Sequence, residues 1–206
     1  MKISIYSLLF ATVLVSCMAY QGFYKVGLKK VERSQNDKEK YGESKIVNFE
    51  IDGKISYAYK DDMIEIVWIP AATQFNFTLR NLTDHSIKII WDEAAYIDQN
   101  GSSRRITHAG VKYIDRNNPQ PPSVIAKNAN IDDVIIPTDN IYFISGKYGG
   151  WSKKPLFDNK ANTKESLNKI TKQYVGKEVR ILLPLKIQKV VNEYIFTFKV
   201  EAFISK

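Results

Sequence analysis

The chain has 206 residues, of which 44% are hydrophobic and 25% charged, so it has enough apolar material for the packed core of one domain of ordinary size, or of a domain with a tail. Its single cysteine excludes an internal disulfide. The formal net charge of +8 favours anionic partners such as lipid headgroups, lipopolysaccharide phosphates or acidic glycans, although a solvated basic surface is the simpler interpretation. Nucleic acid is not an expected partner, because the sequence has no helix-turn-helix, RRM or zinc-finger pattern.

The first sixteen residues have the layout of a secretory signal. Lys2 supplies a positive start, an apolar segment runs over residues 3–15, and the small Ser16 precedes Cys17. The apolar run is short for a helix that spans a bilayer, which needs about 20 residues. The rest of the chain is therefore expected outside the cytosol.

The four residues Leu14-Val15-Ser16-Cys17 resemble the lipobox of bacterial lipoproteins, and this resemblance covers only the leader. It implies that residues 1–16 are a lipoprotein signal peptide that is removed, and that Cys17 becomes the lipidated first residue of the mature protein. One acyl chain holds a protein to a membrane only marginally, whereas two membrane signals hold it stably. The alternatives are an uncleaved anchor helix, an ordinary secretory signal that is cut nearby, and a cysteine that follows a small residue by chance.

The next segment, residues 17–44, is expected to be the lipidated N-terminus followed by a strand and a linker. Apolar residues alternate loosely with lysines from Tyr20 to Arg33, which indicates a candidate first strand. The stretch from Ser34 to Ser44 is polar and charged with one aromatic residue, too little apolar surface to offset its ordering entropy. It is expected to be a mobile loop or linker that leads to a β-sandwich domain over residues 45–206.

From residue 45 onward, short segments with period-2 alternation follow one another, which is typical of a sandwich or barrel. Asp52-Gly53 predicts a hairpin turn between strands at 46–51 and 55–59, and Pro70 is expected to end the strand after them. Asn100-Gly101 predicts a type I′ turn. Further strands are expected at 63–69, 75–80, 87–91, 94–98, 104–107, 131–136 and 141–144, with a terminal hairpin from 179–187 and 194–204.

One helix is expected before that terminal hairpin. Asn162 is the predicted N-cap, Glu165 its capping-box partner, and Gly176 the residue that ends the helix.

A Phe-x-Leu strand at residues 77–79, an asparagine-containing turn and a strand bearing Trp91-Asp92-Glu93 resemble the immunoglobulin-like domains of bacterial envelope lipoproteins. The resemblance spans roughly residues 46–203. It implies an all-β, immunoglobulin-like antiparallel β-sandwich with one short helix before the C-terminal hairpin. The Cys-Trp-Cys framework of true immunoglobulin domains is missing from the sequence. Such a resemblance of fold carries no activity with it.

No catalytic, metal or cofactor motif is found in the sequence. His85 and His108 lack the spacing of a zinc site, and three pairs of adjacent carboxylates, at residues 61–62, 92–93 and 132–133, lack the spacing of a calcium loop. Gly-x-Ser-x-Gly is missing as well. We therefore expect no catalytic residue, no metal and no cofactor, while two carboxylates of a glycosidase could lie apart in sequence.

The best binding candidate is the loop from Ser145 to Pro155. Its glycines give flexibility, Tyr148 and Trp151 offer aromatic rings, and three lysines suit anions. Loops of this kind often carry function. The simpler expectation is that Trp151 folds back to cap the core while the glycines make a turn. The three lysines are Lys147, Lys153 and Lys154.

The sequence thus favours a lipid-anchored envelope protein, a non-catalytic binding or assembly module that recognises a protein or glycan partner. A hydrolase of envelope polymers and a purely structural tether are the alternatives. Met18 is not the aspartate that retains enteric lipoproteins in the inner membrane, and no acidic run follows it. The expected location, which presumes a Gram-negative host, is the outer membrane facing the periplasm.

Overall fold

The computed structural model describes residues 20–33, 41–51 and 53–205, and within them the predicted all-β fold is confirmed. The leader at residues 1–16, Cys17 and residues 34–40 of the expected linker lie outside the described residues. All strand pairs are antiparallel, and one α-helix, α2 (Lys164–Tyr174), precedes the C-terminal strands. None of the helices in the described ranges is both long and apolar enough to cross a bilayer.

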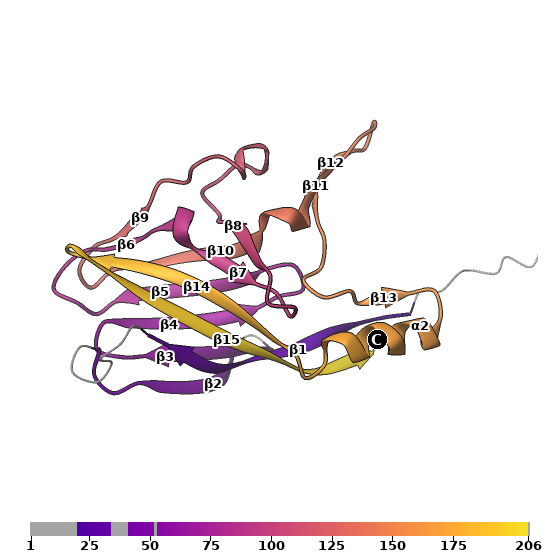
Figure 1. Ribbon diagram of the computed structural model, residues 1–206, viewed down its shortest axis with the longest axis horizontal. Coiled ribbons are helices and arrows are strands. Elements are labelled where there is room, and N and C mark those ends of the chain that lie inside the picture. The colour runs from indigo at the N-terminus through magenta and orange to yellow at the C-terminus, as the bar shows by residue number, and fades with distance from the viewer. Residues whose placement is uncertain (1–19, 34–40, 52, 206) are drawn as a thin grey trace, which may run out of the picture.

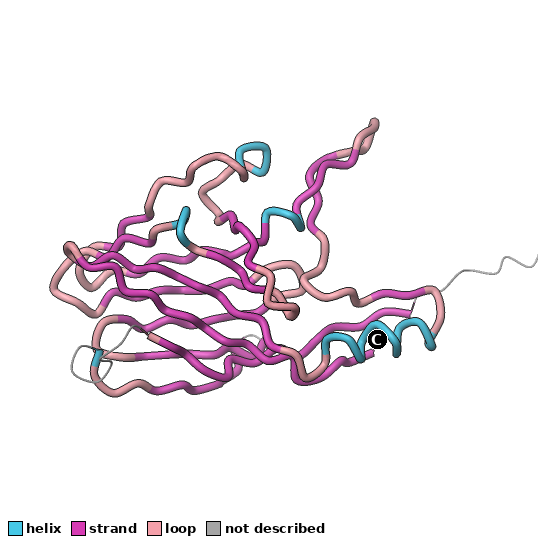
Figure 2. The backbone as a smooth tube through the Cα atoms, viewed as in Figure 1, coloured by secondary structure: helices cyan, strands magenta, loops and turns pink. Residues whose placement is uncertain are grey.

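Within the described residues, thirteen strands form one sheet in the order β13-β1-β15-β14-β7-β8-β10-β5-β4-β3-β2, with β6 paired to β14 and β9 paired to β6. Figure 1 shows β14 and β15 lying across β4 and β5, so the sheet makes two layers. Figure 2 shows that strands make up most of the body and loops its ends. The bounds are β1 (Tyr20–Glu32), β2 (Lys45–Ile51), β3 (Lys54–Lys60), β4 (Ile64–Pro70), β5 (Phe75–Asn81), β6 (Ile87–Ile89), β7 (Ala95–Ile97), β8 (Ser103–Thr107), β9 (Ser123–Ile125), β10 (Asn130–Pro137), β13 (Lys160–Ala161), β14 (Glu178–Ile187) and β15 (Val190–Ser205).

Aromatic side chains fill the space between the two layers. Phe196 and Phe198 of β15 are fully buried, and their rings lie 5.0 and 5.5 Å from that of Trp68 on β4. The alternation predicted for β5 is confirmed, because Phe75, Phe77 and Leu79 are buried while Asn76 and Thr78 between them are only half-buried. Burying one such side chain stabilises the fold by roughly 1.5–3 kcal/mol, so the aromatic core dominates packing.

The first strand joins the sheet directly. β1 pairs with β15 from Gly22 opposite Ser205 to Glu32 opposite Ile195, and it buries Val26 and Leu28. The segment before residue 45 therefore contributes to the same core as the rest of the chain.

Tyr41 differs from the expectation of a mobile linker. Its side chain is fully buried, its ring lies 5.8 Å from that of Tyr194, and its hydroxyl donates a hydrogen bond to Asn192 Oδ1 at 3.0 Å. One aromatic residue thus ties an otherwise polar stretch to the core, a tertiary contact that composition alone does not reveal.

The turn at Asn100-Gly101 is not type I′. Gly101 has a φ of 82°, but Asn100 has a negative φ, and the Gly101 N–H donates to the Asp98 carbonyl at 2.9 Å. This is a three-residue hairpin loop, a type I turn followed by a left-handed glycine. The Asp98 side chain accepts from the N–H groups of Asn100 and Ser102, which favours this turn over the two-residue form.

The helix begins one residue later than predicted. Thr163 is the N-cap, and its hydroxyl accepts the Ser166 N–H at 3.1 Å, so Asn162 lies outside the cap. Gly176 follows the helix with a φ of 87°, as its predicted role requires.

A buried ionic network closes one end of the sandwich around Asp61, whose side chain is fully buried. Its carboxylate accepts hydrogen bonds from the hydroxyls of Tyr59 and Tyr194 at 2.9 and 3.0 Å and from the N–H groups of residues 63–64. Arg33 forms an ion pair with it at 3.5 Å. Burial and the adjacent Asp61 charge raise the pKa of both tyrosines, so their hydroxyls stay protonated and donate.

Asp61→Ala is expected to lower the free energy of unfolding by about 3–5 kcal/mol, because it removes a buried carboxylate that pairs with Arg33 and is the acceptor of two buried tyrosine hydroxyls. Chemical denaturation of wild type and variant measures this loss. The control is Asp84→Ala, which removes a carboxylate from an exposed ion pair with Lys127 and is expected to leave stability unchanged. Equal stability of the Asp61 variant and wild type would contradict the role given to the network.

Candidate functional site: the β11–β12 arm

A two-stranded hairpin stands away from the body of the protein. β11 (Ile141–Ile144) and β12 (Gly150–Lys153) pair with each other and, within the described residues, with no other strand. Figure 1 shows this hairpin, the arm, projecting from the two layers. Its turn depends on glycine, since Gly146 has a φ of 121° and a Cβ at Gly149 would lie 2.1 Å from the Ile144 carbonyl oxygen.

The arm differs from the prediction in its secondary structure. Ser145–Pro155 was expected to be a loop, but Gly150–Lys153 forms β12, and Trp151 pairs with Phe143 across the hairpin. The sequence SGKYGGWSKKP is rich in glycine and lysine, two residues with low β-propensity. Pairing with the apolar β11 overrides that local preference.

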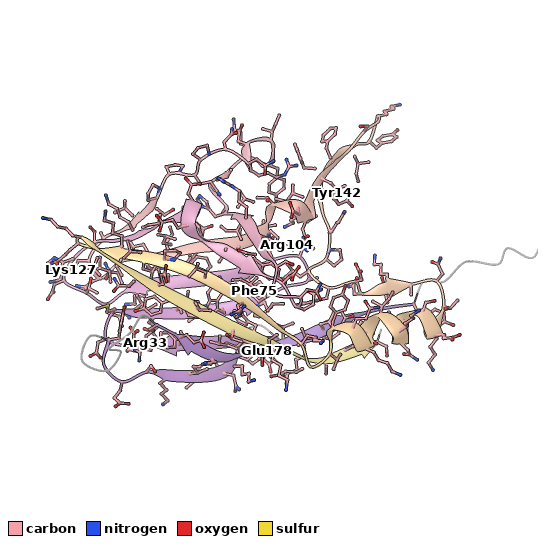
Figure 3. The ribbon with its side chains drawn as sticks, in the orientation of Figure 1. Arg33, Phe75, Arg104, Lys127, Tyr142 and Glu178 are labelled. Carbon is pink, nitrogen blue, oxygen red and sulfur yellow. The ribbon has the colours of Figure 1, made fainter. Side chains whose placement is uncertain are left out.

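The base of the arm is fixed to the body. The Lys154 N–H donates to the Asn140 carbonyl at 2.8 Å, and the Leu156 N–H donates to the Ala72 carbonyl at 2.8 Å. Lys153 Nζ hydrogen-bonds Gln74 Oε1. Figure 3 shows Tyr142 on the arm and Arg104 in the body below it. The arm therefore leaves the body in a defined direction.

Arg104 connects this base to the turn after β7. Its guanidinium donates to Asp98 Oδ2 at 2.7 Å and lies 3.4 Å from Asp139 Oδ2, in the 3-10 turn that precedes β11. Burial disfavours the charged form of Asp98, but the hydrogen bonds from Arg104 and from two backbone N–H groups outweigh it and hold the pKa of Asp98 below its ordinary value. The carboxylate thus stays ionised and keeps Arg104 in place.

The arm exposes large apolar side chains on both of its faces. Phe143 is 58% exposed and Trp151 39%, and their rings pack edge to face at 5.4 Å on one face. Tyr142 and Ile144 are exposed on the other face. Tyr148, in the turn, is 90% exposed. Large apolar surface in a contiguous patch marks an interaction site more often than scattered single residues do.

Trp151 does not cap the core, so the simpler expectation for it is wrong. Its neighbours are exposed or half-buried groups: the ring of Tyr113 at 6.2 Å and the guanidinium of Arg116, 5.0 Å from the centre of the indole. Both residues belong to the irregular segment between β8 and β9, where Ile114 is also exposed. The arm and this segment together form one aromatic and basic surface.

The three predicted lysines lie along the arm in different settings. Lys147 lies 5.5 Å from the centre of the Tyr148 ring, and Lys154 lies 5.8 Å from that of Tyr142. Lys153 faces the body through Gln74. The structure thus brings Lys147 and Tyr148 to the tip and Trp151 to one face, and it keeps Lys153 at the base.

Sequence reasoning missed the contribution of β11. Tyr142, Phe143 and Ile144 fall in the strand predicted at residues 141–144, but a short apolar run does not show whether a strand is buried or exposed. The available signal was the neighbouring glycine-rich turn, which makes β11 the first half of a short hairpin that lacks further strands to cover it.

The carboxylate pairs considered for calcium have other partners. Asp92 forms an ion pair with Arg105 at 2.7 Å, and Asp133 hydrogen-bonds His108 Nδ1 at 3.0 Å. His108 also stacks on the buried Trp91, with ring centres 4.2 Å apart. No group of three or more side chains suited to a metal ion is found in the part of the chain that the structure describes.

A shallow polar depression brings together three carboxylates that an enzyme could use, those of Glu32, Asp98 and Glu178. Each of the three is paired with a cation, Glu178 with Lys29. The hydrogen bond from Lys29 lowers the pKa of Glu178. A general acid needs a raised pKa, so Asp98 and Glu178 are unsuited to that role.

The comparisons with known proteins do not identify the chain. No protein-family model matches it, and no curated protein matches it. Among solved structures, it is similar to the X-ray structure of Northeast Structural Genomics Consortium target SoR45, with 11% sequence identity over 85% of this chain and 83% of that one. The TM-score is 0.23, too low to support an argument about fold or function. The candidate site therefore rests on its own geometry.

Iodide is expected to quench the fluorescence of Trp151 alone, because Trp68 and Trp91 are fully buried. Trp151→Phe should remove the quenchable component, and Trp91→Phe should retain it. Stern–Volmer titration of the three proteins measures the accessible fraction. A wild-type protein with no quenchable component would mean that Trp151 is covered by the core.

Proposed function

We propose that the protein is a non-catalytic binding module of the cell envelope, held at a membrane by lipid on Cys17, and that it captures a protein partner through the β11–β12 arm. The observation that carries the proposal is the arm itself. It places apolar side chains in water on both faces of a hairpin fixed at its base. A lone two-stranded hairpin is at best marginally stable in water, and a contiguous exposed apolar patch marks an interaction site, so this exposure serves contact with a partner.

The open strand edges of the arm support a protein partner. Neither β11 nor β12 has a second strand beside it among the described residues, so each offers backbone N–H and C=O groups along its outer edge. Another chain can pair with such an edge by adding a strand, and alternate side chains then give specificity. Phe143 and Tyr148 would supply the apolar contacts.

A glycan partner fits the geometry less well. Sugar rings stack on an open aromatic face, whereas Arg116 lies over one face of Trp151 and the indole also packs edge to face with Phe143. The alternative of a purely structural tether gives no role to the exposed tip at Tyr148. A hydrolase gains no support from the paired carboxylates Asp98 and Glu178.

The location is part of the same proposal. Leu14-Val15-Ser16-Cys17 supports a lipid anchor, and the first described strand starts three residues after Cys17, so the sheet would lie close to the membrane surface. We place the protein at the outer membrane, facing the periplasm. The two-layer antiparallel architecture is compatible with the immunoglobulin-like type, which we propose for this domain.

The test uses a photo-activatable benzoylphenylalanine at single positions of the full-length protein in its own cells. A probe at Tyr148 is expected to form a discrete cross-linked product with another protein, because this side chain is the most exposed on the arm. Phe143→Ala in the same protein should reduce that product at least tenfold, as expected when an interface anchor is truncated.

The matched control is a probe at Val124, an exposed apolar residue of β9 in the body. It should give no such product. Equal products from both positions, or none from Tyr148, would contradict the assignment of the arm as the contact surface.

A further inference from the structure

The protein also contains an apolar cavity of about 300 Å³ between its two layers, at the end where β1 begins. Its inner wall is formed by the buried side chains Val26, Phe75 and Phe157, which come from β1, β5 and the segment after the arm. Large exposed apolar side chains surround its mouth: Phe23, Ile55 and Ile204. This volume lies at the lower end of the range for ligand pockets in proteins.

Three of the polar side chains along the cavity, those of Tyr24, Lys25 and Asn159, already have partners. The Tyr24 hydroxyl donates to the Asp158 carbonyl at 2.9 Å, and the Asn159 side chain donates to the Gly22 carbonyl at 2.9 Å. Lys25 forms an ion pair with Glu201 at 2.9 Å. A ligand that needs hydrogen bonds would have to break these contacts, whereas a hydrocarbon needs none of them. The lining therefore selects for an apolar chain.

The mouth lies near the proposed anchor. Phe23 is six residues after Cys17, a separation that an extended chain spans in roughly 21 Å or less. If Cys17 carries lipid, as the proposed function holds, the exposed apolar rim lies within reach of the headgroups. Hydrocarbon in that setting comes from the acyl chains of the bilayer.

We propose that the cavity binds one fatty acyl chain of a membrane lipid. The chain would enter between Ile55 and Ile204 and end against Phe75. This inference rests on the proposed function for the source of the lipid, but the affinity of the cavity for hydrocarbon depends only on the described residues.

The experiment places full-length protein in phosphatidylcholine vesicles that contain a phosphatidylcholine with a diazirine near the end of one acyl chain. After illumination, mass spectrometry at residue level is expected to find the label on Val26, Phe75 or Phe157, which are buried and line the cavity. Ala72→Trp and Ala71→Trp, at the cavity wall, should each reduce this labelling at least fivefold. Val124→Trp, outside the cavity, should not reduce it.

Thermal unfolding of each variant verifies that labelling is compared between folded proteins. Labelling confined to residues before Phe23, or labelling unchanged in both wall variants, would overturn the proposal.

A second experiment separates failure of the cavity proposal from failure of the lipid anchor. Vesicle flotation first shows whether the protein is membrane-bound. A protein that does not float is illuminated in solution with a free diazirine fatty acid. Label on Val26, Phe75 or Phe157 then supports binding of an acyl chain in the cavity although the anchor has failed. If these residues stay unlabelled, the cavity proposal is overturned independently of the anchor.

Discussion

The structure depends on the burial of one face of its last strand. β15 pairs with β1 on one side and β14 on the other, and Phe196 and Phe198 project from it onto Trp68 of the opposite layer. Because the two ends of the described chain are neighbours in this pairing, β1, which begins three residues after Cys17, is held by the core. A lipid at Cys17 would therefore hold the sheet itself near the membrane, and not a remote tail.

That core also explains why the arm can point outward. The Asn140 and Ala72 carbonyls accept hydrogen bonds at its base, and Arg104 holds the preceding turn, so the hairpin needs no cover at its tip to keep its direction. A surface that is already ordered loses less entropy on binding than a flexible loop does. The same protein thus combines a fixed base, an apolar tip at Tyr148 and an apolar cavity at the end where β1 begins.

Sequence patterns predicted most strands and the helix because their apolar alternation is local, as in Phe75 and Phe77. Three features depended on contacts that no local pattern encodes. Tyr41 is buried by tertiary packing, Asn100 takes the turn that the Asp98 side chain stabilises, and β12 forms because it pairs with β11. The sequence identified Trp151 as a candidate binding residue. Its exposure became evident only from the structure, in which no further strand pairs with the arm among the described residues.

The central claim is that lipid on Cys17 holds this β domain at a membrane, and the mass of the N-terminal peptide tests it most directly. Mass spectrometry of the protein purified from its native cells would measure the mass of the N-terminal peptide. The account predicts a mature chain that begins at Cys17 and carries both a diacylglyceryl group on sulfur and an acyl group on the new amine. A free thiol at Cys17, or an N-terminus that still includes residues 1–16, would contradict it.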